Sequence, residues 1–192
     1  MIGGKYKLIL AIVGMPGSGK SETTSYLKEK RFQTVRFGQV TDEGVTLLNL
    51  PLTPENERMF REKIRRELGM AAYAIKSKSK IENLLKENDV VIIDGLYSWE
   101  EYKYLKDEYQ NLLLIHVYAE PQIRYKRLAE RAIRPIDTKE SRKRDIAELE
   151  KLNKGGPIAI ADYLIENNTD DINELYQKID KLLKRLGINV YD

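Results

Sequence analysis

The sequence predicts an α/β fold in which a parallel sheet is covered by helices on both faces. Short, strongly apolar runs of strand length alternate with longer, charged segments of helical period. The runs are apolar at nearly every position, which is typical of parallel strands that are buried on both faces. The first run leads directly into a glycine-rich loop and then into a helical segment. The chain has 192 residues without an internal repeat or a linker, so 1–192 is expected to be a single domain.

Five apolar runs have the length of strands. They are Lys7–Val13, Thr34–Phe37, Val90–Ile93, Leu112–Tyr118 and Tyr163–Ile165. Because helical segments separate these runs, the strands are expected to form a five-stranded parallel sheet in a three-layer sandwich.

Three segments carry apolar stripes at spacings of three and four residues, as amphipathic helices do. They are 172–186, which stops before Gly187, 60–68, which ends at Gly69, and 146–152, which ends before Gly155. Two other stretches depart from the alternation of strands and helices. Residues 38–86 are long and mostly helical, and residues 132–143 are short and flanked by arginines. We expect both stretches to be mobile parts that lie over a rigid sheet.

A complete phosphate-binding motif follows the first strand. Residues 14–21 fit the pattern G-x-x-x-x-G-K-[ST], and a helical segment at Glu22–Lys30 comes next. Glycines allow the backbone N–H groups of such a loop to turn inward and wrap phosphate oxygens. The expected cofactor-binding residues are Gly14, Met15, Pro16, Gly17, Ser18, Gly19, Lys20 and Ser21. Lys20 is expected to bring a catalytic charge to the β and γ phosphates, and Ser21 to bind Mg²⁺, so ATP and Mg²⁺ are the expected cofactors.

Asp94 is the second expected metal ligand. It ends the apolar run at 90–93, and ligands of open parallel sheets bind beyond the carboxyl ends of the strands. A carboxylate at that place can hold Mg²⁺ across from Ser21, usually through water. The alternative is an acid that only serves the turn, since Asp-Gly is a common turn pair.

An arginine cluster begins in the segment that Pro121 opens. Its members are Arg124, Arg127, Arg131, Arg134, Arg142 and Arg144. Arginine forks neutralise the negative charge that phosphoryl transfer spreads over oxygen atoms. Arg131, Arg134 and Arg127 are the expected catalytic members, in that order and ahead of Arg142. The alternative is an exposed helix whose arginines pair with nearby acids.

Composition excludes several classes of protein. Acidic and basic residues nearly balance, with a formal net charge of +3, so neither nucleic acid nor an anionic membrane is expected as a partner. The absence of cysteine excludes disulfides and thiolate metal sites. The apolar run at 8–13 is too short to cross a membrane and lacks a cleavage pattern, so a cytoplasmic location is expected.

Each of four further residues has two possible roles. His116 is the single histidine and lies inside an apolar strand, where a core histidine is favoured over a general base. Tyr97, Trp99 and Tyr102 follow the Asp-Gly turn, where they either stack on a base or pack against a helix.

Together these motifs resemble the adenylate kinase-like group of nucleoside and nucleotide kinases, which includes dephospho-CoA kinases. The stretch IIDGLYS resembles their strand-end turn, ERAIRP the start of their arginine-bearing lid, and ADYLIENNTD their last strand. An archaeal set described as adenylate kinase-related is the most similar. The resemblance implies an acceptor-binding insertion at 38–86, a lid at 132–143, and transfer of the γ-phosphoryl group of ATP to a small nucleotide or nucleotide-like acceptor.

The chain departs from that group after the Asp-Gly turn. The turn of adenylate kinases continues into Pro-Arg, whose arginine holds the acceptor phosphate, whereas here it continues into Leu96-Tyr97-Ser98. Ordinary AMP kinase activity is therefore not expected. Arg61 and Arg65 in the insertion, or Arg66, are expected to hold the acceptor phosphate instead, and Asp42 is the nearest candidate for a base.

Two other functions compete with the kinase. One is a regulatory or RNA-associated protein that binds ATP and hydrolyses it slowly. The other is a GTPase, but the sequence lacks its N-K-x-D guanine motif: Asn153-Lys-Gly-Gly has no Asp, and Asn167-Asn-Thr-Asp has no Lys. A second pocket for an acceptor would distinguish a kinase from a regulator.

Overall fold

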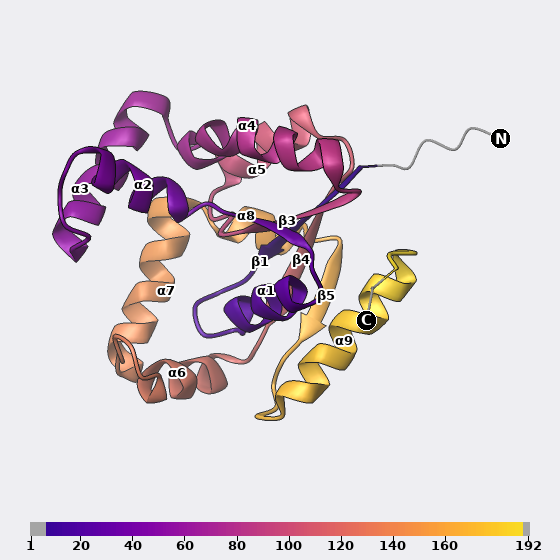
Figure 1. Cartoon of the computed structure of the whole chain (residues 1–192). Coiled ribbons are helices and arrows are strands. Elements are labelled where there is room, and N and C mark those ends of the chain that lie inside the picture. The colour runs from indigo at the N-terminus through magenta and orange to yellow at the C-terminus, as the bar shows by residue number, and fades with distance from the viewer. Residues whose placement is uncertain (1–6, 190–192) are drawn as a thin grey trace.

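A computed structural model describes residues 7–189 of the chain. Its centre is a five-stranded parallel sheet with the order β2-β3-β1-β4-β5 (Figure 1). The strands are β1 (Leu8–Val13), β2 (Gln33–Arg36), β3 (Val90–Asp94), β4 (Leu112–Tyr118) and β5 (Tyr163–Glu166). The five-stranded parallel sheet expected from the sequence is therefore confirmed, with strand ends within one residue of those predicted.

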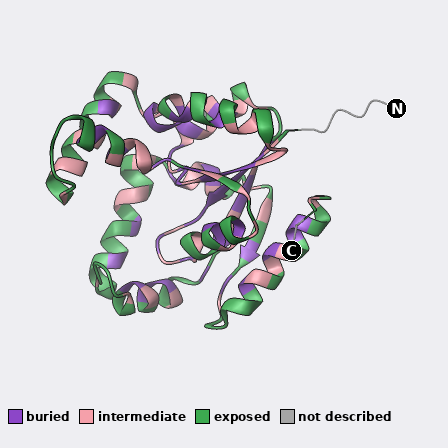
Figure 2. Ribbon diagram, viewed as in Figure 1, coloured by how far each residue is buried: buried purple, intermediate pink, exposed green. Residues whose placement is uncertain are grey.

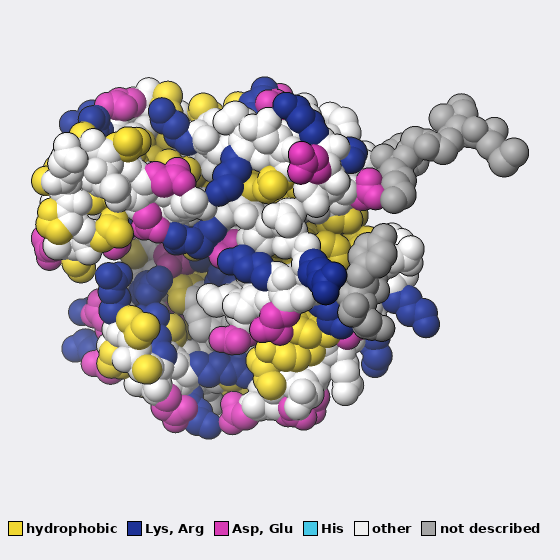
Figure 3. Space-filling view, viewed as in Figure 1, with side chains coloured by type: hydrophobic (Ala, Val, Ile, Leu, Met, Phe, Trp, Pro, Cys, Tyr) yellow, Lys and Arg dark blue, Asp and Glu magenta, His cyan; other side chains and the backbone are white. Residues whose placement is uncertain are grey.

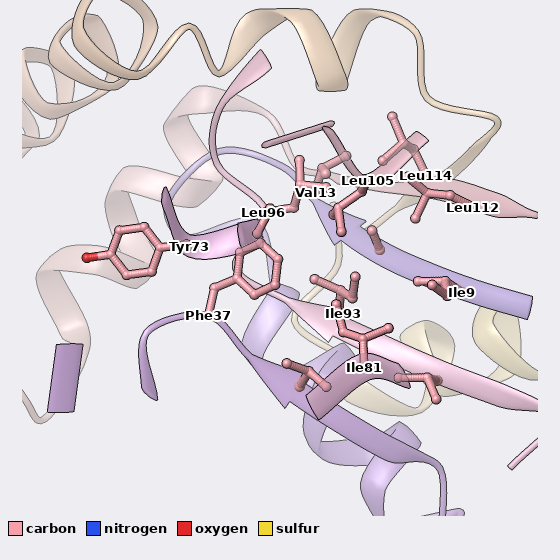
Figure 4. Close-up of a cluster of buried hydrophobic side chains, with 14 of the residues drawn as sticks. Ile9, Val13, Phe37, Tyr73, Ile81, Ile93, Leu96, Leu105, Leu112 and Leu114 are labelled. Carbon is pink, nitrogen blue, oxygen red and sulfur yellow. The ribbon is translucent and has the colours of Figure 1, made fainter. Parts of the chain in front are cut away.

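Helices cover both faces of the sheet, which Figure 2 shows as the most completely buried part of the molecule. Helices α4 (Ala72–Glu87) and α5 (Trp99–Glu108) cover one face, where Ile81 and Leu105 join a cluster that includes Ile9 and Ile93 (Figure 4). Helices α1 (Lys20–Glu29) and α9 (Ile172–Arg185) cover the other face. Side chains of successive residues alternate between the two clusters, so each central strand is apolar throughout.

The segment expected as an insertion divides into two parts. Helices α2 (Gln39–Leu47) and α3 (Pro54–Leu68) lie beyond the end of the sheet (Figure 1). Helix α4 instead buries Ala72, Ala74 and Ile81 against the sheet and belongs to the covering layer. Helix α3 begins at a Thr53 cap and ends at Gly69, whose φ of 74° is in the left-handed region.

The segment expected as a lid is a loop at 131–137 followed by the first turns of a helix. The loop joins α6 (Pro121–Glu130) to α7 (Thr138–Leu152), which Asp137 caps by accepting a hydrogen bond from the backbone N–H of Glu140 at 2.7 Å. In Figure 1, α7 runs from this loop toward α2. The short helix α8 (Gly155–Ala159) then returns the chain to β4 and α5.

The apolar stripe expected at 146–152 is not the buried face of α7. Ile146 and Leu149 are 44% and 45% exposed, whereas Ser141 and Asp145 are buried. The helix turns its polar face inward because it borders the phosphate loop rather than the apolar core. No helix within residues 7–189 has the length and apolarity to cross a membrane.

Glu101 stabilises the turn that follows β3. Its Oε2 accepts hydrogen bonds from the backbone N–H groups of Tyr97 at 2.7 Å and Ser98 at 3.0 Å. The Ser98 hydroxyl in turn accepts from the backbone N–H of Glu101, which completes a capping box at the start of α5. Burial raises the pKa of Glu101 to about 7, against the hydrogen bonds from Tyr97 and Ser98 and the charge of Arg65, while Glu100 adds to the rise.

We predict that Glu101→Gln stabilises the protein at pH 8 more than at pH 5. A raised pKa in the folded state means that the contribution of Glu101 to stability is full below its unfolded pKa and is lost as the pH rises through about 7. Above that pH the buried charge opposes folding by about 3 kcal/mol. Glutamine keeps an oxygen acceptor for both N–H groups and carries no charge.

Thermal unfolding at the two pH values measures the effect, and Asp107→Asn is the control because Asp107 is an exposed acid on the same helix. An equal change of Tm at pH 5 and pH 8 would contradict the assignment.

Candidate functional site

The phosphate loop occupies the space between β1 and α1, at the carboxyl end of the sheet. Glycine is required at two places by both conformation and space. Gly14 has a φ of 148°, and a Cβ there would lie 2.3 Å from the carbonyl oxygen of Val117. Gly17 has a φ of 78°, and a Cβ there would lie 2.6 Å from the carbonyl oxygen of Arg124. The loop therefore presses its backbone against β4 and α6, and a side chain at either position would displace it.

Three side chains hold the loop in shape. Lys20 lies across it and donates from Nζ to the carbonyl oxygen of Met15 at 2.9 Å. Arg124 donates to the carbonyl oxygen of Pro16, and Asn167 to that of Ser18, both at 2.9 Å. These bonds occupy backbone carbonyl groups and leave backbone N–H groups of the loop for an anion.

Burial also acts on the charges of the site. The pKa of Lys20 is lowered to about 7, mainly by desolvation and also by the charges of Lys154 and Arg144, while the charges of Glu148 and Asp94 oppose the change. Within the loop, the hydroxyl oxygen of Ser18 is buried without a hydrogen-bond partner in the protein. A loop with a partly buried ammonium and an unpaired hydroxyl fits a phosphate group, which supplies both a negative charge and acceptor oxygens.

Asp94 lies beside this loop. It ends β3, and the strand register pairs it with Ile12 of β1 and Arg36 of β2. Burial raises the pKa of Asp94, and the charges of Lys28, Lys20 and Arg36 oppose the rise. Ser21 is exposed in the first turn of α1. Carboxylate and hydroxyl oxygens are ligands that suit Mg²⁺, which commonly binds one or two protein groups together with substrate phosphates.

Arg124 is the structural member of the arginine cluster. Its guanidinium forms a two-point ion pair with Asp145 of α7, at 3.1 and 2.7 Å, and Nε donates to the carbonyl oxygen of Ala119. The hydroxyl of Tyr125 also donates to Asp145, at 2.9 Å. Arg124 is only 5% exposed, and with the bond to Pro16 each of its three guanidinium nitrogens has a partner, which fixes α6, α7 and the loop to one another.

The three arginines expected to be catalytic lie in different surroundings. Arg127 donates to the carbonyl oxygens of Asn167 and Thr169 at 2.9 and 2.5 Å, so its donors are engaged with the loop after β5. Arg131 is half-exposed and donates from Nε to the carbonyl oxygen of Arg134 at 2.6 Å. Arg134 has a left-handed φ of 53° and forms an exposed ion pair with Glu57 of α3 at 3.8 Å. The structure thus leaves Arg131 and Arg134 with donors that face solvent.

The arginines of the insertion lie across from the lid loop. Arg61 pairs with Glu57 at 3.3 Å, and the Arg65 guanidinium lies 5.4 Å from the centre of the Tyr73 ring. The Nε of Arg65 is buried without a hydrogen-bond partner in the protein. Asp42, the candidate base, is ion-paired with Arg36. Figure 3 shows Lys and Arg side chains gathered along the hollow that crosses the visible face of the molecule.

The aromatic residues after the Asp-Gly turn pack within the protein. Trp99 stacks on Tyr102 with ring centroids 5.2 Å apart, and it also contacts Gly156 of α8 so closely that a Cβ there would lie 2.6 Å from the indole. The Tyr97 ring lies beneath the Lys154 ammonium at 4.8 Å. His116 is half-buried in β4 beside Tyr118, and burial lowers its pKa, with the charge of Lys20 acting in the same direction.

Four residues at this site were not predicted from the sequence to belong to it. They are Asp145, Glu148, Lys154 and Asn167. Lys154 and Glu148 form a buried ion pair at 2.5 Å. The charges of both residues act on the pKa of Lys20. One signal was present in the sequence: Ser141, Asp145 and Glu148 follow the spacing of one helix face, a polar stripe that the apolar stripe of the same helix obscured.

The chain matches known proteins along most of its length. Residues 10–170 match the family model described as "AAA domain". A UPF0200 protein of Thermococcus sibiricus is 36% identical over 186 residues, covering 94% of this chain and 96% of the relative. A UPF0200 protein of Sulfurisphaera tokodaii is 38% identical over 183 residues, covering 93% of this chain and 97% of the relative.

Solved structures show the same fold at low sequence identity. A shikimate kinase from Bacteroides thetaiotaomicron has a TM-score of 0.60 at 13% identity, covering 94% of this chain and 99% of that one. A gluconokinase from Sinorhizobium meliloti has a TM-score of 0.50 at 11% identity, covering 95% and 97%. The expected grouping with adenylate kinases and dephospho-CoA kinases is not confirmed by these matches. With its phosphate loop, parallel sheet and archaeal relatives, the chain belongs to the UPF0200 family and carries an AAA domain of the P-loop type.

Proposed function

We propose that this protein transfers the terminal phosphoryl group of Mg-ATP to a small nucleotide or nucleotide-like acceptor. The observation that carries the proposal is the phosphate loop at 14–21, in which glycine is required by the packing and Lys20 lies across the backbone. The likeness to a shikimate kinase and a gluconokinase supports a phosphotransferase fold, because both use the same architecture.

The residues of the loop would hold the triphosphate. Backbone N–H groups of 17–21 and the start of α1 favour negative charge, and Lys20 adds a full positive charge. Ser21 and Asp94 would hold Mg²⁺, which when bound neutralises charge on the phosphates. Lys20, now bonded to the carbonyl of Met15, is within the loop and needs only a change of side-chain rotamer to reach a phosphate.

The lid loop would supply further positive charge. Arg131 and Arg134 lie on a short loop between two helices, and the ion pair of Arg134 with Glu57 reaches α3 of the insertion. Closure of this loop over bound ATP would bring both guanidinium groups to the phosphates and exclude water. Arg127 would act differently, since it holds the backbone of the loop after β5.

The acceptor would lie between the insertion and the turn after β3. The unpaired Nε of Arg65 and the neighbouring Arg61 offer donors to an acceptor phosphate. The turn itself offers no cationic side chain, because it continues into Leu96, which is buried in the core, Tyr97, which lies beneath Lys154, and Ser98, which caps α5. An acceptor phosphate would therefore be held from the insertion side alone, which is why AMP is expected to be a poor acceptor.

We predict that Lys20→Ala lowers the affinity for Mg-ATP by about tenfold or more, because a charge-assisted contact to phosphate is lost. Calorimetry measures the affinity, and Lys181→Ala is the control, since Lys181 is an exposed lysine on α9, away from the loop. Unchanged ATP affinity in the Lys20 variant would refute binding at the loop.

We predict that Asp94→Asn leaves binding of metal-free ATP nearly intact and weakens the gain in affinity that Mg²⁺ produces. Asparagine keeps the shape of the side chain and removes the charge that would hold the cation. Titration with Mg²⁺ at a fixed ATP concentration tests this. If both proteins respond identically to Mg²⁺, Asp94 is an acid of the turn and not a metal ligand.

The decisive experiment for the proposed function offers labelled ATP together with a panel of acceptors: AMP, other nucleoside monophosphates, dephospho-CoA, nucleosides, shikimate and gluconate. We expect transfer to a nucleotide-like member and turnover of AMP about a hundredfold slower, since a misplaced acceptor reacts slowly. Rapid turnover of AMP would overturn the role given to the Leu96–Ser98 turn. Slow hydrolysis without transfer to any acceptor would instead support a regulatory ATP-binding protein.

A further inference from the structure

Lys154 is a buried lysine at the junction of two helices. It follows Asn153, which ends α7 in a left-handed conformation with a φ of 52° and turns the chain inward. Its residue is only 2% exposed. An ammonium is removed from water only at a large cost in free energy unless the site provides negative charge or π electrons, so a lysine at this depth requires partners.

The groups around Lys154 do not fully neutralise the positive charge at this place. Its Nζ lies 2.5 Å from Oε2 of Glu148 and 4.8 Å from the centre of the Tyr97 ring. Oε1 of the same carboxylate accepts from Nε of Arg144 at 3.1 Å. One carboxylate thus serves two cations, and the group of Arg144, Glu148 and Lys154 has a net positive charge.

This positive group lies against the phosphate loop. Helix α7 is fixed to the loop through Asp145 and Arg124, whose guanidinium donates to the carbonyl oxygen of Pro16. Gly155, the residue after Lys154, lines the same cavity of about 300 Å³ as Met15 of the loop. Among the charged groups, Lys154 contributes most to the lowered pKa of Lys20. The positive charge of Lys154 therefore lies on the side of α7 that borders the phosphate loop.

We propose that Lys154 is a second phosphate-binding lysine, which contacts the terminal phosphoryl group of bound ATP from the α7–α8 side of the site. The proposal rests on ATP binding at the loop, as in the proposed function. An anion placed between two cations removes their repulsion, which a triphosphate would do here. Glu148 holds Lys154 at the site in the absence of the anion.

The position of Tyr97 indicates which phosphate is contacted. Its ring lies beneath Lys154 and approaches Gly95, since a Cβ on Gly95 would lie 3.2 Å from the ring. Gly95 follows Asp94 at the end of β3, the side on which the acceptor is expected. Lys154 should therefore contact the terminal phosphoryl group and not the inner phosphates. Its loss should lower the affinity for ATP more than the affinity for ADP.

The test compares the affinities for Mg-ATP and Mg-ADP, by calorimetry, in the wild type and four variants. Lys154→Gln removes the charge. Lys154→Gln with Glu148→Gln removes the whole buried pair, and of the three charged groups only the more exposed Arg144 keeps its charge. Glu148→Gln alone frees Lys154 from its carboxylate. Lys151→Gln is the control, because Lys151 is exposed in the last turn of α7. The emission of Trp99, the single tryptophan, which packs on Gly156, reports whether the α7–α8 junction is intact.

We expect Lys154→Gln and the double variant to lose about tenfold or more in ATP affinity and less than threefold in ADP affinity, since one charge-assisted contact is lost. Glu148→Gln should shift the ratio of the two affinities in favour of ATP. Because this variant keeps Lys154, it still tests the proposal if the other variants fold poorly. Equal effects on ATP and ADP, or a loss of ATP preference in Glu148→Gln, would overturn the proposal. The transfer assay tests the proposed function separately. If an acceptor is phosphorylated but Lys154→Gln leaves the ratio of ATP to ADP affinity unchanged, only this inference is refuted. If no acceptor is phosphorylated but the affinity ratios change as expected, only the transfer reaction is refuted.

Discussion

The buried ion pair between Arg124 and Asp145 fixes the geometry on which the site depends. Arg124 follows β4 on α6, Asp145 lies in the middle of α7, and the same guanidinium holds the carbonyl oxygen of Pro16. The loop, the helix before the lid and the helix after it are thereby joined at one point. Removal of either partner would leave a buried charge without its counterion, which is strongly destabilising, so this contact tolerates substitution poorly.

The inward polar face of α7 follows from that arrangement. A helix that packs on a sheet normally buries its apolar stripe, and α9 does so with Leu175, Ile179 and Leu183. Helix α7 instead buries Ser141 and Asp145 and leaves Ile146 and Leu149 half-exposed. In this arrangement α7 buries less apolar surface, and it brings charged groups next to the phosphate loop.

The sequence predicted the sheet and the loop well because each depends on local patterns. Strand β4 is apolar on both faces and was predicted at its observed bounds, and the loop motif has fixed spacing. Contacts between distant residues were beyond reach. Nothing local separates Arg124, which is buried, from Arg131, which faces solvent, since both lie at helical spacing in a charged segment. Lys154 was missed for a similar reason, because a lysine after a helix normally indicates exposed surface.

An ion pair between the exposed Arg134 and the partly buried Glu57 joins the loop at 131–137 to α3. Pairs of this kind contribute at most about 1 kcal/mol and weaken as ionic strength rises, because mobile ions screen charges beyond roughly 10 Å at 0.1 M salt. Its strength is thus set by the solvent as much as by the protein. A rise in salt concentration should therefore weaken the contact between the loop at 131–137 and α3, while the buried contacts beneath the phosphate loop keep their strength.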